Sequence, residues 1–318
     1  MRAAEVHTPG QPPVAAERTV PAAGRDEVLV DVAAAPVTPL DLLCATGTSY
    51  FGVPITPYVP GVQGVGTVGG RPVWFATSAG MAPGDGSMAE QAVVATSDVV
   101  ELPDGVDPMA MAALGLSAVA AHQALTWRGE LAAGETVLVL GGGGVVGQVA
   151  IQLARLHGAS RVVAAARSVT GQQRAWGAGA DAVVPLDTDD VVALASRFRE
   201  AAGGEVDLVL DPLYGAPAAA AAKSLRAHGR LVNLGSSAHE HAPIDSSTLR
   251  SRSLRLLGYT NNELSTERRA DAVRAVASYA ADGRLSVARE VLPLEAVGEA
   301  WQRQAEGRTT GRLVLSMG

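Results

Sequence analysis

The 318-residue sequence predicts an α/β protein in which a doubly wound parallel sheet is combined with a β-rich domain. Three observations predict this class. Short β-type runs separated by Pro and Gly fill the first third of the chain, strand-like and helix-length segments then alternate, and a run of glycines joins the first such strand to its helix. The chain is too long for one ordinary core, which suggests two domains.

The first third of the chain has the pattern of an all-β unit. Alternation of polar and apolar residues is clearest from Glu27 to Val32. The predicted strands are Glu27–Ala34, Gly61–Val68, Arg71–Ala76 and Met88–Val94. Near Pro108 the composition changes to an Ala-rich helical sequence that continues through Leu125.

The middle of the chain repeats a strand followed by a helix, which is typical of βαβ units in a parallel sheet. The predicted strands are Val137–Leu140, Val162–Ala166, Ala182–Pro185, Val206–Leu210 and Arg230–Leu234. The last part of the chain adds predicted strands at Leu254–Gly258 and Arg312–Ser316 and predicted helices near Glu267–Asp282 and Leu294–Ala305.

Composition and charge exclude several classes of partner. A net charge of -7 gives no electrostatic footprint for nucleic acid or for an anionic membrane. Cys44 is the single cysteine, so no internal disulfide and no multi-cysteine zinc site can form. The first residues contain no apolar segment of the secretory kind, and Val137–Ala154, the most membrane-like run, is interrupted by glycines and glutamines. We expect a soluble, cytoplasmic protein.

The glycine run predicts a dinucleotide site. Gly142, Gly144 and Gly147 form G-x-G-x-x-G between a strand and a helix, with Val145 and Val146 filling the last gap. We expect Gly142 to make the tight turn, Gly144 to let a pyrophosphate approach the backbone, and Gly147 to let the helix lie close to the strand. The phosphates would then contact free N–H groups at the positive end of the helix.

The end of the next strand predicts which dinucleotide binds. An enzyme that uses NAD usually has Asp or Glu there, which binds the ribose 2′-hydroxyl, whereas a 2′-phosphate requires a cation instead. This strand ends in Ala166, followed by Arg167 and Ser168. Arg167 can pair with a phosphate and Ser168 can donate to it, so NADPH is the predicted cofactor. The alternative is that Arg167 is a solvated surface residue.

These residues and several other segments resemble a known family. The chain is similar almost end to end to the zinc-independent medium-chain dehydrogenases/reductases, and most of all to the NADPH:quinone oxidoreductases that include zeta-crystallin. Besides the glycine run, the matching segments are residues 37–61 with their SY-x(6)-PY-x-PG pattern, GSMAEQAVV, the GLSA at residue 115, HGRLVNLGSS and GRTTGRLVLS.

The resemblance implies a domain arrangement and further cofactor residues. It implies a chaperonin-10-like catalytic domain at residues 1–118, completed by about 262–318, and a Rossmann NADPH-binding domain at 119–261, with the active cleft at their junction. It also places Gly235 and Ser236 along the cofactor and Ser117 near the nicotinamide, although these three residues could equally be turn and helix-packing residues.

The sequence departs from the wider family at the metal site. Zinc-dependent relatives have a His-Glu pair where this chain has Val62-Gln63, and Cys44 stands alone. A zinc site needs three protein ligands, so we expect no metal site and expect Cys44 to be a buried apolar residue. Thr38 stands where related quinone reductases usually have Asn, and the connection from Val68 to Met88 is shorter than theirs.

A zinc-free hydride transfer to a conjugated carbonyl or quinone needs donors that stabilise the negative oxygen and supply a proton. Tyr50 is the first candidate, and it matches a tyrosine that lines the cleft in the family. Thr38 is the second candidate and Tyr58 the third. The alternative is that Tyr50 only lines an apolar pocket while water supplies the proton. Asp41 is expected to be a structural cap rather than a base.

Three functions follow from this sequence. The first is an NADPH-dependent reductase of quinones or α,β-unsaturated carbonyls, acting on a small-molecule substrate as a homodimer. The second is a tailoring enoyl reductase acting on a CoA-bound or carrier-bound intermediate. The third is a non-catalytic NADPH-binding protein with a structural or regulatory role.

Overall fold

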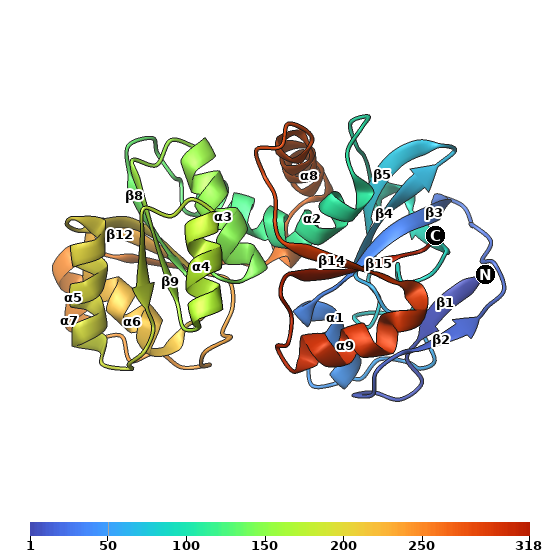
Figure 1. Cartoon of the computed structure of the whole chain (residues 1–318), viewed down its shortest axis with the longest axis horizontal. Coiled ribbons are helices and arrows are strands. Elements are labelled where there is room, and N and C mark those ends of the chain that lie inside the picture. The colour runs from blue at the N-terminus through green and yellow to red at the C-terminus, as the bar shows by residue number, and fades with distance from the viewer. Residues whose placement is uncertain (50) are drawn as a thin grey trace. The chain divides into compact units, whose positions relative to one another are not determined.

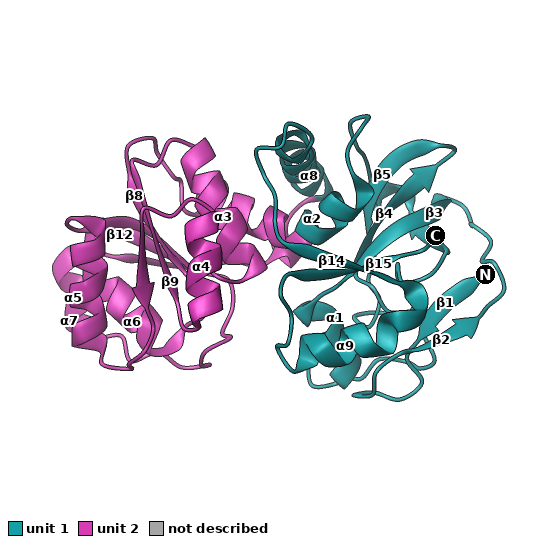
Figure 2. Cartoon of the chain, viewed as in Figure 1, with its two compact units in different colours: residues 1–115, 266–318 teal, residues 116–265 magenta. Residues whose placement is uncertain are grey.

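The computed structural model describes residues 1–49 and 51–318 and divides the chain into two compact units. Unit 1 consists of residues 1–115 and 266–318, and unit 2 consists of residues 116–265. Figure 2 shows the two units in different colours. Unit 2 is therefore one continuous segment inserted between two parts of unit 1.

Unit 1 is built on a seven-stranded sheet in which strands from both ends of the chain meet. The sheet has the order β14-β15-β3-β4-β5-β7, and β6 pairs with β3. The C-terminal strand β15 pairs antiparallel with β3, with Leu313 opposite Val37. The strands are β3 (Glu27–Val37), β4 (Gln63–Val68), β5 (Arg71–Ala76), β6 (Gln91–Ala95), β7 (Val99–Glu101), β14 (Arg289–Pro293) and β15 (Arg312–Ser316).

Unit 1 also contains elements that the sequence pattern does not predict. A small antiparallel pair forms from β1 (Arg2–Glu5) and β2 (Val14–Glu17), which are rich in Ala and contain only one β-branched residue, Val14, of the kind that usually identifies a strand. The short edge strands β7 and β14 and the helix α1 are also additional. The helices are α1 (Pro39–Thr46), α8 (Thr266–Ala281) and α9 (Val297–Ala305), with 3-10 turns η1 (Thr96–Asp98) and η4 (Leu294–Ala296).

The core of unit 1 lies between its sheet and α9. Phe75 of β5 and Leu313 and Leu315 of β15 are completely buried in it. Val297 and Trp301 of α9, four residues apart and so on one helix face, pack against the same cluster. The core therefore needs residues from both ends of the chain.

Unit 2 is a six-stranded parallel sheet with helices on both faces (Figure 1). The strand order β10-β9-β8-β11-β12-β13 is the 3-2-1-4-5-6 order of the dinucleotide-binding Rossmann fold, which confirms the predicted fold class. The strands are β8 (Thr136–Leu140), β9 (Arg161–Ala166), β10 (Ala182–Pro185), β11 (Val206–Asp211), β12 (Leu225–Asn233) and β13 (Arg255–Gly258). The helices are α3 (Val145–Leu156), α4 (Val169–Gly177), α5 (Val191–Ala202), α6 (Gly215–Ser224) and α7 (Ser246–Arg252), with a 3-10 turn η3 (Asn261–Glu263).

The chain passes from unit 1 to unit 2 within α2 (Pro108–Gln123), which continues as a π-helical turn η2 (Ala124–Arg128). Gly115 breaks α2, because its φ of 34° and ψ of -135° are not helical. A Cβ at Gly115 would lie 2.1 Å from Oε1 of Gln63, whose side chain also accepts a hydrogen bond of 3.1 Å from the Trp74 indole. The glycine is therefore required both by the backbone angle and by the packing of Gln63.

The segment Pro108–Arg128 is also long and apolar enough to span a membrane by composition. Of its most apolar window, 61% is buried inside the protein, and the break at Gly115 interrupts the helix. We therefore explain it as a core helix. The run Val137–Ala154, which is the most membrane-like by sequence inspection, instead forms a strand, a glycine turn and most of a helix.

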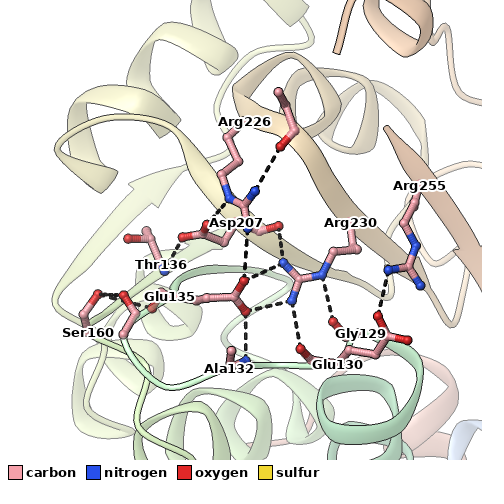
Figure 3. A network of polar contacts seen from close by, with 12 residues as sticks. Gly129, Glu130, Ala132, Glu135, Thr136, Ser160, Asp207, Arg226, Arg230 and Arg255 are labelled. Carbon is pink, nitrogen blue, oxygen red and sulfur yellow. Dashed lines mark hydrogen bonds and ion pairs between the residues drawn. The ribbon is translucent and has the colours of Figure 1, made fainter. Parts of the chain in front are cut away.

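A polar network lies at the amino ends of β8, β11 and β12 (Figure 3). Arg230 of β12 donates to both carboxylate oxygens of Glu135, at 2.8 and 2.7 Å, and also to the carbonyls of Gly129, Glu130 and Asp207. Arg226 binds Asp207 and Glu135 beside it. Burial alone would raise the pKa of Glu135, but the hydrogen bonds from Arg230 and from the Ala132 N–H hold it below its usual value.

Two histidines in unit 2 give stability a specific pH dependence. The rings of His122 on α2 and His157 at the end of α3 lie 5.5 Å apart in an edge-to-face arrangement. Burial, and the neighbouring His157, lower the pKa of His122 to about 4. Between these two pKa values, the folded state keeps His122 neutral, whereas the same histidine in the unfolded chain, with a pKa of about 6.5, takes up a proton.

We expect this histidine to reduce stability as the pH falls from about 6.5 to 4, by up to roughly 1.4 kcal/mol per pH unit. The measurement is the urea midpoint of the protein and of His122→Gln at several pH values in this window. The variant should lose less stability on acidification than the unmutated protein. Parallel pH profiles for the two proteins would show that His122 does not carry this effect.

Candidate dinucleotide site

The glycine run connects β8 to α3 at the carboxyl edge of the parallel sheet, and each glycine meets a different steric demand. Gly141 has a φ of 66° and so adopts the left-handed conformation in this turn. The sequence predicts Gly142 in the tight turn, and Gly142 is the next residue of the same turn. Gly142 is required for packing, because its Cβ would lie 2.8 Å from the Cβ of Ala164 on β9. Gly142 lies within the turn itself, while the positive φ belongs to the glycine before it.

Gly144 and Gly147 lie where the motif predicts them. Gly147 is in the first turn of α3, and a Cβ on it would lie 2.3 Å from the Gly141 carbonyl oxygen, so only glycine lets the helix approach the turn. Gly144 is the exposed N-cap of α3 and has no side chain to bind the first N–H groups of the helix. A Cβ there would contact only the Gly141 oxygen, at 3.5 Å. The space and the N–H groups of Val145 and Val146 fit a pyrophosphate.

The turn after β9 packs directly against this loop. A Cβ on Gly143 would lie 2.4 Å from the Cα of Gly171 in α4, so the two backbones are in contact. Ser168 is the N-cap of α4, and its hydroxyl accepts a hydrogen bond of 3.0 Å from the Gly171 N–H. Sequence reasoning missed this contact between Gly143 and Gly171, although the unusual fourth glycine was a signal.

Arg167 lies in this turn with its side chain exposed. It makes no side-chain hydrogen bond or ion pair to any residue in the described part of the chain. Ala166 before it is buried at the end of β9 and leaves no carboxylate at that position. The arrangement fits a dinucleotide that carries a 2′-phosphate.

The turn after β11 packs against the glycine loop from another side, which the sequence analysis did not identify. Asp211 is completely buried and accepts hydrogen bonds from the N–H groups of Leu213 and Tyr214, at 2.9 and 2.8 Å, and from Asn233 at 3.0 Å. Burial raises the pKa of its carboxyl. A Cβ on Gly141 would lie 3.2 Å from the side chains of Pro212 and Leu213, so this turn contacts the glycine loop.

Tyr214 has a φ of 59° and a ψ of -159°, a combination that essentially only glycine adopts. The hydrogen bonds of Asp211 hold this strained residue at the start of α6. Such strain is typical of functional sites, and the Pro and Gly on either side of Leu213-Tyr214 were the available sequence signal.

The residues predicted from the resemblance lie in two places. Gly235 follows β12, and a Cβ on it would lie 3.0 Å from the Pro212 carbonyl oxygen, so this turn packs against the end of β11. Ser236 is exposed and donates a hydrogen bond of 2.7 Å to Glu240. Ser117 is half-buried in α2, two residues after the break at Gly115. The cofactor role of these three residues stays a prediction.

The predicted catalytic residues belong to unit 1, and Tyr50 lies outside the described residues. Thr38 is the N-cap of α1 and forms a capping box with Asp41. The Thr38 hydroxyl donates to the Asp41 carboxylate at 2.6 Å, and the other carboxylate oxygen accepts from the Val62 N–H. Thr38 is only 5% exposed, and its hydroxyl proton is already donated to Asp41. A structural role therefore explains Thr38 better than a catalytic one.

Tyr58 and Cys44 are core residues of unit 1. Tyr58 is 4% exposed and packs with Val6 and Ala79, and burial raises the pKa of its hydroxyl. Cys44 is 1% exposed, and burial raises the pKa of its thiol to about 11, as expected for an apolar buried cysteine. The structure therefore does not favour Tyr58 as a proton donor.

Comparisons with known proteins place this chain in one family. Residues 178–315 match a family model described as a zinc-binding dehydrogenase. A quinone oxidoreductase from Rattus norvegicus is 30% identical over 251 residues, which cover 74% of this chain and 73% of the relative. The chain belongs to the zinc-independent quinone oxidoreductases of the medium-chain dehydrogenase/reductase family.

Solved members of this quinone oxidoreductase family have the same architecture. A mycobacterial quinone oxidoreductase has a TM-score of 0.89 at 25% identity, covering 99% of both chains. The quinone oxidoreductase from Thermus thermophilus, also solved in complex with NADPH, has a TM-score of 0.79 at 28% identity and covers both chains completely. The protein is therefore an oxidoreductase.

The position that binds zinc in zinc-dependent relatives is different in this chain. Gln63, in the place of the zinc-binding pair, is buried against Trp74 and Gly115. Across residues 1–49 and 51–318, the structure places no group of three or more His, Cys, Asp or Glu side chains where it could hold a metal ion.

Proposed function

We propose that this protein is an NADPH-dependent reductase that transfers hydride to a quinone or an α,β-unsaturated carbonyl without zinc. One observation carries the proposal: the open glycine loop contacts a turn that presents Arg167 and no carboxylate. Bound NADPH supplies the hydride. The cofactor agrees with the one predicted from the sequence and is supported by the NADPH complex of the Thermus thermophilus relative.

The residues of unit 2 bind and orient this cofactor. The N–H groups at the start of α3 hold the pyrophosphate, and Gly144 leaves the space for it. Arg167 pairs with the 2′-phosphate, where a planar guanidinium can donate two hydrogen bonds. The strained turn at Tyr214 and the turn at Gly235 form the wall beyond the glycine loop.

The proton donor is a separate question within this proposal. Tyr50 remains the best side-chain candidate, because a phenol is neutral at pH 7 and can donate to the oxygen that becomes negative. Thr38 is a weaker candidate because its hydroxyl donates to Asp41. If Tyr50 only lines the pocket, water supplies the proton.

We expect Tyr50→Phe to lower kcat by roughly 10²-fold while the Kd for NADPH stays unchanged, because the change removes the donor but keeps the ring. Steady-state kinetics with a good quinone or enone and fluorescence titration with NADPH measure the two values. Tyr58→Phe is the matched control and should leave kcat close to that of the unmutated enzyme. A Tyr50→Phe rate within about threefold would assign the proton to water or Thr38.

The experiment that tests the function is NADPH oxidation with a panel of small quinones, enones and acyl thioesters. The protein should first be dialysed against EDTA, and turnover of quinones or enones should persist. Turnover of thioesters alone would favour the tailoring enoyl reductase. NADPH binding without turnover of any substrate would favour a non-catalytic role.

We also infer that the protein is a soluble, cytoplasmic homodimer. The edge strand β13 supports the dimer. Only one of its two sides pairs with another strand of the sheet, and its Leu256 side chain is 39% exposed. Light scattering of the purified protein should give twice the mass of the chain. A monomeric mass at micromolar concentration would exclude the dimer.

A further inference from the structure

A hollow of about 460 Å³ lies in unit 2 between α5, α6 and α7, which Figure 1 shows grouped at one end of that unit. Three cations and four hydroxyls line it, and no carboxylate is among its lining residues. The cations are Arg199, Lys223 and Arg252, and the hydroxyls are named below.

The C-terminal end of α6 brings the three cations together. Arg199 of α5 donates to the carbonyl of Lys223, and Arg252 of α7 donates to the carbonyl of Leu225. These carbonyls are two residues apart, so the two guanidiniums and the Lys223 ammonium converge from three helices. A cation near one helix C-terminus is ordinary, but three that face one hollow repel one another unless an anion lies between them.

The local charges leave the hollow positive. Lys223 is paired with Asp245, and Arg252 is paired with Glu205 at 3.0 Å. Arg199 has no carboxylate partner among the residues that the structure describes. Each guanidinium carries five N–H donors, and most of them are not used by these contacts.

The hydroxyls add neutral donors on both sides of the same hollow. Ser196 lies on the α5 face that also carries Arg199, and Ser247 and Ser251 lie one turn apart on α7. The Thr248 hydroxyl lies 3.4 Å from the Lys223 Nζ. Arginine, lysine and hydroxyl groups together are the donors that bind a phosphate group.

The hollow is distinct from the dinucleotide site. In a parallel sheet with crossover helices, the helices run opposite to the strands, so their C-terminal ends lie at the amino edge of the sheet. Arg199, Lys223 and Arg252 are in the last turn of their helices. The glycine loop lies at the carboxyl edge, at the other end of the strands.

The geometry points to a second anion site in this hollow, which binds a dianionic phosphate group, either free or as a small phosphate monoester. Its occupation compensates the charge of Arg199, which has no carboxylate partner among the described residues, and adds an acceptor for Lys223 and Arg252. It also links α5, α6 and α7, so a bound phosphate should stabilise unit 2.

The test is calorimetric titration of the full chain, saturated with NADPH, with inorganic phosphate or glycerol 3-phosphate at constant ionic strength. NADPH keeps the probes out of the dinucleotide site. We expect one phosphate per chain with a Kd of about 1 mM or tighter. Stronger binding of one probe would distinguish the free ion from the ester.

Two variants and one control make the test specific. Arg199→Gln should weaken phosphate binding at least tenfold, and Ser196→Glu, which places a carboxylate in the hollow from an exposed position, should abolish it. Arg197→Gln is the control, because Arg197 lies on the same helix, is paired with Asp187 and does not line the hollow. No binding to the NADPH-saturated protein, or an equal loss in Arg197→Gln, would overturn the proposal. NADPH turnover should be the same in all three variants, so this result is independent of the proposed enzymatic function.

Discussion

Arg167→Glu is expected to reverse the cofactor preference of the protein. The arginine contributes charge-assisted hydrogen bonds to the 2′-phosphate of NADPH, whereas a glutamate repels this phosphate and can accept from the 2′-hydroxyl of NADH. The variant loses the hydrogen bonds to the 2′-phosphate and gains one to the 2′-hydroxyl. The difference between the two binding free energies should therefore change by about 4 kcal/mol, which changes the ratio of the two Kd values roughly 1000-fold. Fluorescence titrations with NADPH and NADH measure the ratio.

The exposed position of Arg167 makes this variant easy to interpret. Its side chain is not tied to any residue in the described ranges, so its replacement should not disturb the turn. Arg197→Glu gives the same change of net charge in unit 2 and should leave the ratio unchanged. Equal affinities of the unmutated protein for NADPH and NADH would contradict the cofactor assignment.

Glu135→Ala should lower the free energy of unfolding by about 3 to 5 kcal/mol, because it leaves the buried guanidinium of Arg230 without its carboxylate. The side chains of Arg230 and Glu135 are 6% and 13% exposed, so water cannot replace the lost partner easily. Figure 3 shows how closely Arg230 is enclosed by this carboxylate and the neighbouring carbonyls. The urea midpoint of the full chain measures the loss.

Glu130→Ala is the matched control for this network. Glu130 also binds an arginine, Arg255, at 2.7 Å, but the two side chains are 61% and 44% exposed. Exposed ion pairs contribute only about 0 to 1 kcal/mol. A similar shift of the urea midpoint in both variants would show that burial of the Arg230–Glu135 pair does not increase the cost of removing its carboxylate.

The sequence was sufficient to predict the sheet of unit 2 and the position of its glycine turn. Apolar strands of the right length, each followed by a helix, have few other ways to bury both faces of a sheet. It could not show which glycine takes the positive φ, because that depends on contacts of Ala164 and Gly171 with the loop. The strained turn at Tyr214 depends in the same way on the buried carboxylate of Asp211.

The candidate site in unit 1 was harder to predict. Thr38 and Asp41 have the spacing of a capping box, which was a readable signal that the threonine starts a helix. Tyr58 carries a polar group, so its pattern alone does not distinguish a cleft residue from a core residue. The strands β1 and β2 were missed because their stability comes from pairing rather than from β-forming residues.

The pairing of the C-terminal strand β15 with β3 determines the order in which the two units can be completed on the ribosome. Unit 2 is continuous, and its two ends are joined by a hydrogen bond of 3.1 Å from Asn261 to the Leu116 carbonyl. It can therefore fold as soon as residue 265 has emerged. Unit 1 begins first but must wait for the last residues, and until then the long strand β3 has an open edge. Truncated or stalled chains of this protein should therefore contain a finished dinucleotide unit beside an aggregation-prone, incomplete sheet.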